Sequence, residues 1–501
     1  MYGVLILRSY ERNDCMKRAL YVLVALALAV TAVGCKAEGK NKEGKSDILS
    51  AASAQSEIAP DGSESETGAS GEQQTSPQQS AASKKDSAIG GASLAESQAQ
   101  QLKNYKFVFG TIFPEQYQTG GARAAEFNAK VSELKTKYGV TVTLQGYKPE
   151  EFTQQVNGAI MAGKDVPNAL ETGIVEARNL MTTGALADLK SFSGIKLDNG
   201  NFLNWSTEGN TFNGKTYAVS TSVRSFFGMF FNDDMVKKEA KADIYKLYKN
   251  GEWTWSKMRE IAVACKKDLD GDKRTDVYGV IGRSSIIGTA LVSSAGGTSV
   301  KQNGKIRVVM CDQPGIDAIT YLRTLHKTDA TMKYVTNVED TEKVFIEKGA
   351  ALLCHNLDYA NGIGSKIDFT MGYVPFPKPD GTAKYNAAVY GTNVYCIPRN
   401  VKDKEITGVV LNELSYLGKV DIEKVIKSLK SAGISQDGIN IYNDQCKNAV
   451  MDYSLGPHFT AEINTKIENC VINSGSQPQS VIEGIRSSAQ KLSDDYYNSI
   501  K

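Results

Sequence analysis

A regular alternation of strand-like and helix-like segments, beginning at residue 106, restricts this chain to a small group of folds. Lys106–Phe113 reads KFVFGTIF, an almost continuous apolar run that suits a strand covered on both faces. Apolar residues from Phe127 to Tyr138 then recur at helical spacing, and Gly139 stands where a C-cap glycine belongs. The pattern continues with a strand, a helix and a further strand, at residues 140–144, 150–162 and 169–174. This alternation specifies a parallel sheet, so the predicted fold class is α/β.

The N-terminus has the pattern of an export signal. Lys17 and Arg18 precede an apolar run over 19–33, about fifteen residues, whereas a membrane span needs roughly twenty. Ala32-Val33-Gly34-Cys35 resembles the bacterial lipoprotein signal, in which the cysteine is acylated and becomes the first mature residue. We therefore expect residues 1–35 to be a signal peptide, with the true start at Met16 and the lipid on Cys35. An ordinary signal peptide with a coincidental cysteine is the alternative.

A low-complexity segment follows the cysteine. Residues 36–103 consist mainly of Ser, Ala, Gln and Glu, with almost no large apolar side chain. Such a segment cannot offset its ordering entropy by burial, which predicts a disordered tether that spans on the order of 45 Å. The folded part is then expected at 104–501, held near the membrane but free to reorient.

Charge and cysteine usage exclude several classes of partner. The formal charge of +2 gives no excess of either sign, so neither nucleic acid nor an anionic membrane surface is implied as a partner. No pair of cysteines has the CxxC or Cys/His spacing that a zinc site needs. Six cysteines remain, and an exported chain allows up to three disulfides among them; they are Cys265, Cys311, Cys354, Cys396, Cys446 and Cys470. The apolar runs around Cys265, Cys354 and Cys396 favour buried free thiols as the alternative at these three positions.

Seven segments resemble, in the right order, landmarks of the extracellular solute-binding proteins (family 1 type) of carbohydrate ABC importers. Among them are FNGKTYAV at Phe212–Val219 and KDLDGDKRTDVYG at Lys267–Gly279. The others lie at residues 230–234, 251–255, 293–297, 345–352 and 375–377. The resemblance implies a two-lobed periplasmic-binding-protein-like fold with a hinge and an interlobe cleft. Lobe 1 would comprise about 104–236 and lobe 2 about 237–343, each with part of the C-terminal region.

The same resemblance implies an extracytoplasmic, lipid-anchored protein of the cell membrane. It would bind a mono- or oligosaccharide in the cleft and deliver it to the permease subunits of an ABC importer. Ligand contacts with both lobes would favour the closed state over the open one. No cofactor is implied, and we expect a monomer that does not act as an enzyme.

Aromatic, amide and carboxylate side chains after predicted strands and near the crossings are candidate ligand residues. Sugar sites combine aromatic faces, which stack on the pyranose ring, with polar groups that hydrogen-bond its hydroxyls. The candidates are Phe113, Glu115, Gln116, Tyr117, Glu171, Thr172, Trp205, Ser222, Arg224, Asn356, Asp358, Tyr359, Tyr390 and Asn393. For each of them, ordinary surface or core packing is the alternative.

An acidic loop has part of the spacing of a calcium site. Four aspartates fall at positions 1, 3, 5 and 9 of a loop: Asp268, Asp270, Asp272 and Asp276. Position 12 is Gly279, so the bidentate glutamate of an EF-hand is absent. A structural calcium ion and a solvated turn between helix and strand are the two interpretations.

Two other functions are alternatives to carbohydrate delivery. The sequence contains no nucleophile elbow, P-loop, HExxH or dinucleotide fingerprint. A glycosidase nevertheless needs only two carboxylates, which can lie far apart in a chain, so a surface lipoprotein enzyme acting on glycans is one alternative. The other is a binding protein of the same fold for peptides or other small solutes.

Overall fold

The computed structural model describes residues 102–500 except 199, 224–225, 298, 336, 390–391, 448, 454–459 and 473–474. The predictions of a signal peptide, of a lipid on Cys35 and of a tether over 36–103 lie outside the described residues. Within the described ranges, no helix is long and apolar enough to cross a membrane.

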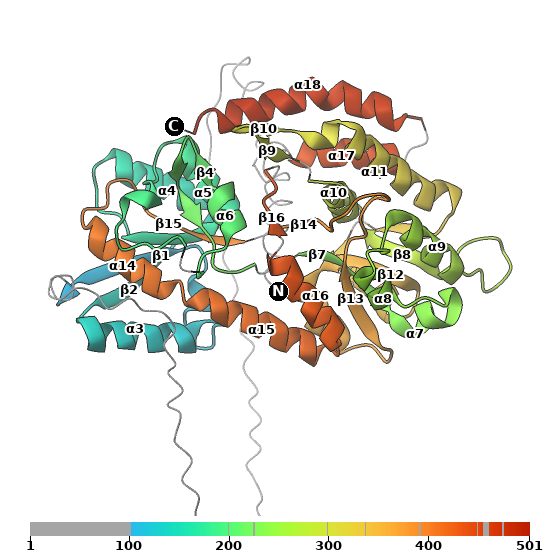
Figure 1. Cartoon of the computed structure of the whole chain (residues 1–501), viewed down its shortest axis with the longest axis horizontal. Helices are drawn as coiled ribbons and strands as arrows, with labels where there is room; N and C mark the ends of the chain where they lie inside the picture. The colour runs from blue at the N-terminus through green and yellow to red at the C-terminus, as the bar shows by residue number, and fades with distance from the viewer. Residues whose placement is uncertain are drawn as a thin grey trace, which may run out of the picture. The chain divides into compact units, whose positions relative to one another are not determined.

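A five-stranded sheet, which we call the first sheet, forms from the N-terminal part of the described chain and one late strand (Figure 1). Its order is β2-β1-β3-β15-β6, with β1 and β2 parallel, β1 and β3 parallel, and β15 antiparallel to β3 and β6. The strands are β1 (Lys106–Thr111), β2 (Thr141–Gly146), β3 (Ala169–Gly173), β6 (Ala218–Val219) and β15 (Asn393–Cys396). The parallel arrangement predicted for the first three strands is confirmed.

Helices cover both faces of the first sheet. Phe107 and Phe109 pack in one apolar cluster with Phe127 and Leu134 of the first helix, whereas Leu170 belongs to another cluster on the opposite face. Gly139 ends the first helix with a φ of 74°, as its sequence position predicts. The helices are α3 (Ala124–Tyr138), α4 (Pro149–Met161), α5 (Ile174–Thr182) and α6 (Asn204–Gly209), followed by the hairpin of β4 (Thr211–Phe212) and β5 (Lys215–Thr216). We call this assembly the first lobe.

A second five-stranded sheet has the order β11-β8-β12-β7-β13. Strands β11, β8 and β12 are parallel, and β7 runs antiparallel between β12 and β13. The strands are β7 (Phe227–Asn232), β8 (Tyr278–Arg283), β11 (Met332–Val335), β12 (Ala350–Asn356) and β13 (Met371–Pro375). The predicted first lobe extends to about residue 236, whereas the backbone of β7 pairs within this second sheet.

The helices around the second sheet complete the second lobe. Trp253 and Trp255 anchor it: Trp253 Nε1 donates to the carbonyl of Pro375 at 2.9 Å, and Trp255 Nε1 donates to that of Pro377 at 3.1 Å. The helices are α7 (Asp233–Met235), α8 (Ile244–Lys249), α9 (Trp255–Cys265), α10 (Ser284–Ser294), α11 (Gln313–Arg323), α12 (Val338–Ile346) and α13 (Ala360–Gly364). A hairpin of β9 (Val300–Gln302) and β10 (Lys305–Arg307) lies beside them.

The C-terminal helices distribute between the lobes (Figure 1). Helix α14 (Lys404–Leu414) contacts α3, and α15 (Leu417–Ser431) contacts α3 in the first lobe and α13 in the second. Helices α17 (Thr460–Ile472) and α18 (Pro478–Tyr497) pack on α10 and α11, respectively, in the second lobe. The remaining elements are α16 (Gln436–Lys447) and the pair of β14 (Ala387–Ala388) and β16 (Ala449–Val450). Short 3₁₀-helices lie at Pro114–Gln116, Leu189–Ser191, Val309–Cys311 and Leu357–Tyr359, and short π-helices at Val236–Ala240 and Thr324–Thr328.

Among the described residues, two crossing segments lead from one sheet to the other: residues 220–223 and 226 between β6 and β7, and residues 389 and 392 before β15. Phe226 and Val389 bridge to each other, and both belong to an apolar cluster that also contains Leu170 of the first sheet and Leu353 of the second. The two lobes therefore share a core around their crossings. All six cysteines of the described chain are buried free thiols.

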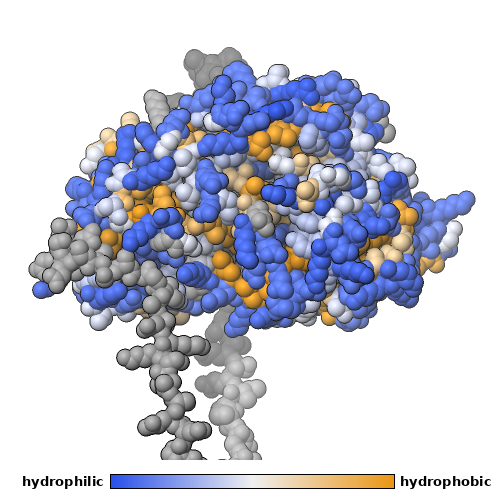
Figure 2. Space-filling view, in the orientation of Figure 1, coloured by the Kyte–Doolittle hydropathy of each residue, from blue (hydrophilic) through white to orange (hydrophobic). Residues whose placement is uncertain are grey.

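The outer surface is mainly hydrophilic on the face shown in Figure 2, with apolar residues in separate patches. The large apolar side chains that are exposed in the described ranges are Met161, Val263, Leu269, Val450 and Leu492.

Candidate functional site

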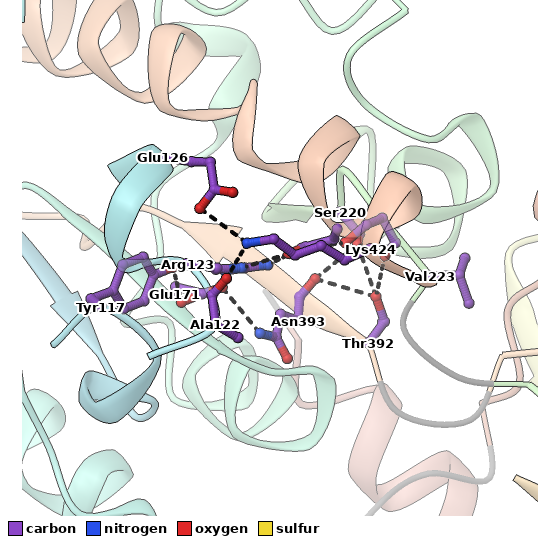
Figure 3. A network of polar contacts seen from close by, with 12 residues as sticks. Tyr117, Ala122, Arg123, Glu126, Glu171, Ser220, Val223, Thr392, Asn393 and Lys424 are labelled. Carbon is purple, nitrogen blue, oxygen red and sulfur yellow. Dashed lines mark hydrogen bonds and ion pairs between the residues drawn. The ribbon is translucent and has the colours of Figure 1, made fainter. Parts of the chain in front are cut away.

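A buried carboxylate lies in the middle of β3 and is hydrogen-bonded to residues around the crossing segments (Figure 3). Glu171 is fully buried and accepts hydrogen bonds from Thr111 Oγ1 at 3.0 Å and from Tyr117 OH at 2.6 Å. Its other oxygen accepts from Asn393 Nδ2 at 3.0 Å and from an Nη of Arg123. Four donors thus satisfy this carboxylate, as a buried charge requires.

Arg123 joins Glu171 to a second carboxylate from a distant part of the chain. Its Nε lies 2.9 Å from Asp421 Oδ1 on α15, and one Nη also donates to Asp421, while the other lies 2.7 Å from Tyr117 OH. Burial lowers the pKa of Arg123, but the charges and hydrogen bonds of its partners raise it further, so the guanidinium stays charged. Burial and the charge of Glu171 raise the pKa of Tyr117, which stays neutral.

Both crossing segments are tied to these ions. Ser222 Oγ donates to Asp421 Oδ2 at 3.0 Å, and Asn393, which follows the second crossing, donates to Glu171. Ser220 Oγ lies 2.8 Å from Thr392 Oγ1 and donates to the carbonyl of Asn393 at 2.8 Å. We call the set Thr111, Tyr117, Arg123, Glu171, Ser222, Asn393 and Asp421 the hinge framework. It fixes the loop after β1, strand β3, helix α15 and both crossings to one another.

Four sequence-predicted ligand residues belong to this framework: Tyr117, Glu171, Ser222 and Asn393. The structure brings these residues together, and their polar groups bond to members of the framework. These four side chains therefore hold the elements around the hinge in place.

Four other predicted residues carry a buried polar atom that has no hydrogen-bond partner in the described part of the chain. These atoms are Glu115 Oε1, Thr172 Oγ1, Trp205 Nε1 and Asn356 Oδ1. The first three lie in the first lobe, on the turn after β1, on β3 and on α6, whereas Asn356 is the last residue of β12 in the second lobe. Because most buried polar groups are paired, unpaired ones on both lobes point to groups that a ligand can satisfy. We call these four residues the unpaired set.

The remaining candidates have varied surroundings. Phe113 and Tyr359 are half-buried and pack against the apolar cluster that both lobes share, Gln116 is buried, and Asp358 is exposed. The carbonyl of Gln116 accepts from the backbone N–H of Arg123 at 2.7 Å. Arg224 and Tyr390 lie outside the described residues, so their assignment stays a prediction.

Three ionisable residues near the site are not among the residues predicted from the sequence. Arg123 follows a glycine-rich loop and Asp421 precedes an amphipathic segment, and 298 positions separate the two residues in the chain. Glu176, in the first turn of α5, has its pKa raised by burial, and its Oε2 lies close to Gly173. The position of Glu176 directly after β3 is the only feature of the sequence that could have indicated a place near the site.

His355, next to Asn356, is almost completely buried. Its Nδ1 accepts from the N–H of Asn356 at 2.8 Å, and its Nε2 lies 3.5 Å from Glu342 Oε1. Burial lowers the pKa of His355 to about 4, so the ring is neutral near pH 7.

The acidic loop between α9 and β8 brings three of its four predicted aspartates together. Carboxylate oxygens of Asp268, Asp270 and Asp276 lie within 4.8 Å of one another and are exposed, while Asp272 is not part of the group. Backbone N–H groups already bond to these carboxylates: Gly271 donates to Asp268 at 2.7 Å, and Leu269 donates to Asp276 at 2.6 Å. The spacing suits an oxygen-ligated ion, and the loop also closes by its own hydrogen bonds, so both interpretations stay predictions.

Comparison with known proteins places this geometry among solute-binding proteins. The family model described as bacterial extracellular solute-binding protein matches residues 122–412, more than half of the chain. A search of curated proteins found no match.

Solved structures of the same architecture cover most of the chain. The cyclic α-maltosyl-1,6-maltose binding protein from Arthrobacter globiformis has 14% identity and a TM-score of 0.60, over 78% of this chain and 99% of that one. The sugar-binding protein MalE from Xanthomonas citri has 12% identity and a TM-score of 0.57, over 78% and 97%. UgpB from Mycobacterium tuberculosis, in complex with glycerophosphocholine, has 16% identity and a TM-score of 0.55, over 78% and 98%. At these identities the likeness establishes the two-lobed α/β fold, which confirms the predicted fold class.

Proposed function

Because this chain belongs to the bacterial extracellular solute-binding family, we propose that it is the substrate-binding subunit of an ABC importer and that its ligand is a mono- or oligosaccharide. The ligand lies between the lobes, and its contacts with both of them favour the closed arrangement. The permease subunits then recognise the closed protein and take up the sugar.

The observation that carries the proposal is the unpaired set, with members on both lobes. Each buried group without a partner costs about 1–3 kcal/mol, which a ligand hydroxyl recovers because it can donate to Glu115 or Asn356 and accept from Trp205. Phe113 and Tyr359 add aromatic faces of the kind that stack on sugar rings. Two of the similar structures are described as binding sugars.

The chemistry of the hinge framework favours a neutral ligand. Arg123 is a buried cation, but Glu171 and Asp421 already neutralise it. An acidic ligand such as a phosphodiester would gain little from this residue. The similar structure with glycerophosphocholine makes such compounds the appropriate competitors in a binding test.

The remaining parts of the proposal concern anchoring and chemistry. Cleavage before Cys35 leaves the lipidated cysteine as the first mature residue, and residues 36–103 tether the binding domain outside the cytoplasm. Binding requires no cofactor and involves no turnover, and the protein acts as a monomer. A calcium ion at Asp268, Asp270 and Asp276 would be structural, because these carboxylates are exposed and already bonded to their own loop.

A thermal-shift screen with product analysis tests this function. Purified protein is heated with sugars, amino acids, short peptides and glycerophosphodiesters; a ligand at one hundred times its Kd adds about 2.7 kcal/mol to the free energy of unfolding. We expect stabilisation by a sugar that is recovered unchanged. Cleavage of the sugar would replace the proposal with an enzyme, and stabilisation by peptides or phosphodiesters alone would replace the ligand class.

A further inference from the structure

The last turn of α18 and the residues after it reach from the second lobe to the first. Tyr496 OH donates to Asn179 Oδ1 of α5 at 2.9 Å, and Asn213, in the turn between β4 and β5, donates to the carbonyl of Ile500 at 3.0 Å. The ring of Tyr497 stacks on Phe212 with centroids 5.8 Å apart. Tyr497 and Ile500 are buried by this contact.

Arg178 of α5 forms the centre of the same interface. The side chain is fully buried, and one Nη donates to the carbonyl of Asp452 at 3.1 Å. Its guanidinium carbon lies 5.3 Å from the ring centroid of Tyr453 and 5.9 Å from that of Tyr497. Cation–π contacts of this kind are worth more when the cation is desolvated.

The partners of Arg178 are held by the second lobe. The N–H of Tyr453 donates to the carbonyl of Ser299 at 3.1 Å, and Ser293 Oγ of α10 lies 3.4 Å from Asp452 Oδ2. The body of α18 is fixed there too: Gln490 Nε2 donates to the carbonyl of Ile306 at 2.8 Å, and Arg486 Nε donates to that of Cys311 at 2.7 Å.

Lys301 of β9, in the second lobe, adds a contact to the β4–β5 hairpin of the first lobe. Its Nζ donates to the carbonyl of Thr211 in the first lobe and lies 4.6 Å from the ring centroid of Phe212. Phe212 therefore has the ring of Tyr497 and the ammonium of Lys301 against it, both from second-lobe elements.

We infer that Arg178, Phe212, Asp452, Tyr453, Tyr496, Tyr497 and Ile500 form an interlobe clasp, in which the C-terminal end of the chain holds the first lobe against the second. Separation of the lobes breaks these contacts, because each joins an element of one lobe to an element of the other. The clasp thus sets the open–closed equilibrium, and with it ligand affinity, without a contact to the ligand. Its effect on affinity rests on the proposed function, but its effect on lobe separation does not.

Distance measurements on the ligand-free full chain test the clasp. Spin labels are placed at Met161→Cys of α4 and Val263→Cys of α9, both exposed, and Cys15 and Cys35 are replaced by serine. The six other cysteines are buried. Double electron–electron resonance then compares the parent protein with a variant that lacks residues 496–501. We expect the interlobe distance to lengthen or broaden in the truncated protein.

A milder variant keeps the test valid if the truncated protein does not fold. The pair Tyr496→Phe and Asn213→Ala removes two hydrogen bonds of the clasp and leaves every buried ring in place. Lys491→Ala is the matched control, because Lys491 lies on the exposed side of the same helix and pairs only with Asp495 among the described residues. An unchanged distance distribution in the folded clasp variants would overturn the inference.

A titration of the same variants separates the clasp from the proposed function. With the sugar found in the screen, the clasp variants should bind about tenfold more weakly, which corresponds to about 1.4 kcal/mol. If no sugar binds and the interlobe distance still changes, the clasp stands and the proposed function fails. If a sugar binds with equal affinity in all variants and the distance is constant, the clasp fails and the function stands.

Discussion

The hinge framework and the unpaired set both include residues on β3 and in the turn after β1, but they differ in how their polar groups are satisfied. In the framework, Glu171 accepts from four donors and Arg123 joins two carboxylates. In the unpaired set, buried atoms such as Trp205 Nε1 and Asn356 Oδ1 have no partner among the described residues. The comparison distinguishes polar side chains that are paired within the protein from polar side chains that are left for a ligand. The same residue types occur in both groups.

The largest expected effect comes from breaking the framework. Arg123→Met leaves the carboxylates of Glu171 and Asp421 buried without their cation, which should lower the free energy of unfolding by about 3–5 kcal/mol. Urea denaturation measures the change. Lys148→Ala, which removes an exposed pair with Glu151, is the control and should cost no more than about 1 kcal/mol. Equal effects in the two variants would mean that the framework is not structural.

Acidification should weaken the fold through His355, beside the unpaired set. Burial lowers the pKa of His355 from 6.5 to about 4, so between these values the unfolded chain binds a proton that the folded chain does not. The free energy of unfolding should therefore fall as the pH drops from about 6.5 to about 4, by about 3 kcal/mol in total. Urea titrations of the parent and His355→Gln proteins measure this contribution. A parallel pH dependence in the two would contradict it.

Two buried threonines on neighbouring strands sharpen the comparison. Thr111 Oγ1 donates to Glu171, whereas Thr172 Oγ1 has no partner in the described chain, and both residues are fully buried. Thr111→Val should cost about 1.5–3 kcal/mol of unfolding free energy, because a hydrogen bond to a charge is lost. Thr172→Val should be neutral or slightly stabilising, since it removes an unsatisfied hydroxyl. Chemical denaturation of the two variants decides the matter, and a larger loss for Thr172→Val would reverse our assignment.

The smallest effect is expected at the acidic loop. Its carboxylates are exposed and accept from their own backbone, so removal of calcium with EGTA should lower Tm by at most about 2 °C. Sugar affinity should not change. A loss of binding on chelation, restored by added calcium, would show that the ion supports the ligand site.

The local parts of the fold could be predicted from sequence. The alternation from residue 106 to 174 appears as β1, α3, β2, α4 and β3, and Gly139 caps its helix. The acidic segment lies between a helix and a strand as expected. These features depend on neighbouring residues, whose periodicity and turn chemistry are visible in the chain.

Features that depend on distant pairing could not be predicted. Strand β15 pairs with β3 through Asn393 and Gly173, which are far apart in the chain, and no local pattern specifies this partner. Arg123 meets Asp421 for the same reason. Residue type suggested polar groups near the strand ends as ligand contacts, but whether each one is satisfied within the protein depends on the assembled fold. The predicted ligand residues therefore divide between the framework and the unpaired set.

The central claim is that groups unpaired in the protein bind the hydroxyls of a sugar. The most direct test is isothermal titration of the sugar identified in the screen into the parent, Trp205→Phe and Trp255→Phe proteins. Trp205→Phe removes an unpaired N–H, whereas Trp255→Phe removes one that is bonded to Ser294 and Pro377. We expect Trp205→Phe to weaken binding about tenfold with little loss of stability, and Trp255→Phe to lower stability with affinity unchanged. Unchanged affinity in Trp205→Phe, or an equal loss in both variants, would contradict the claim.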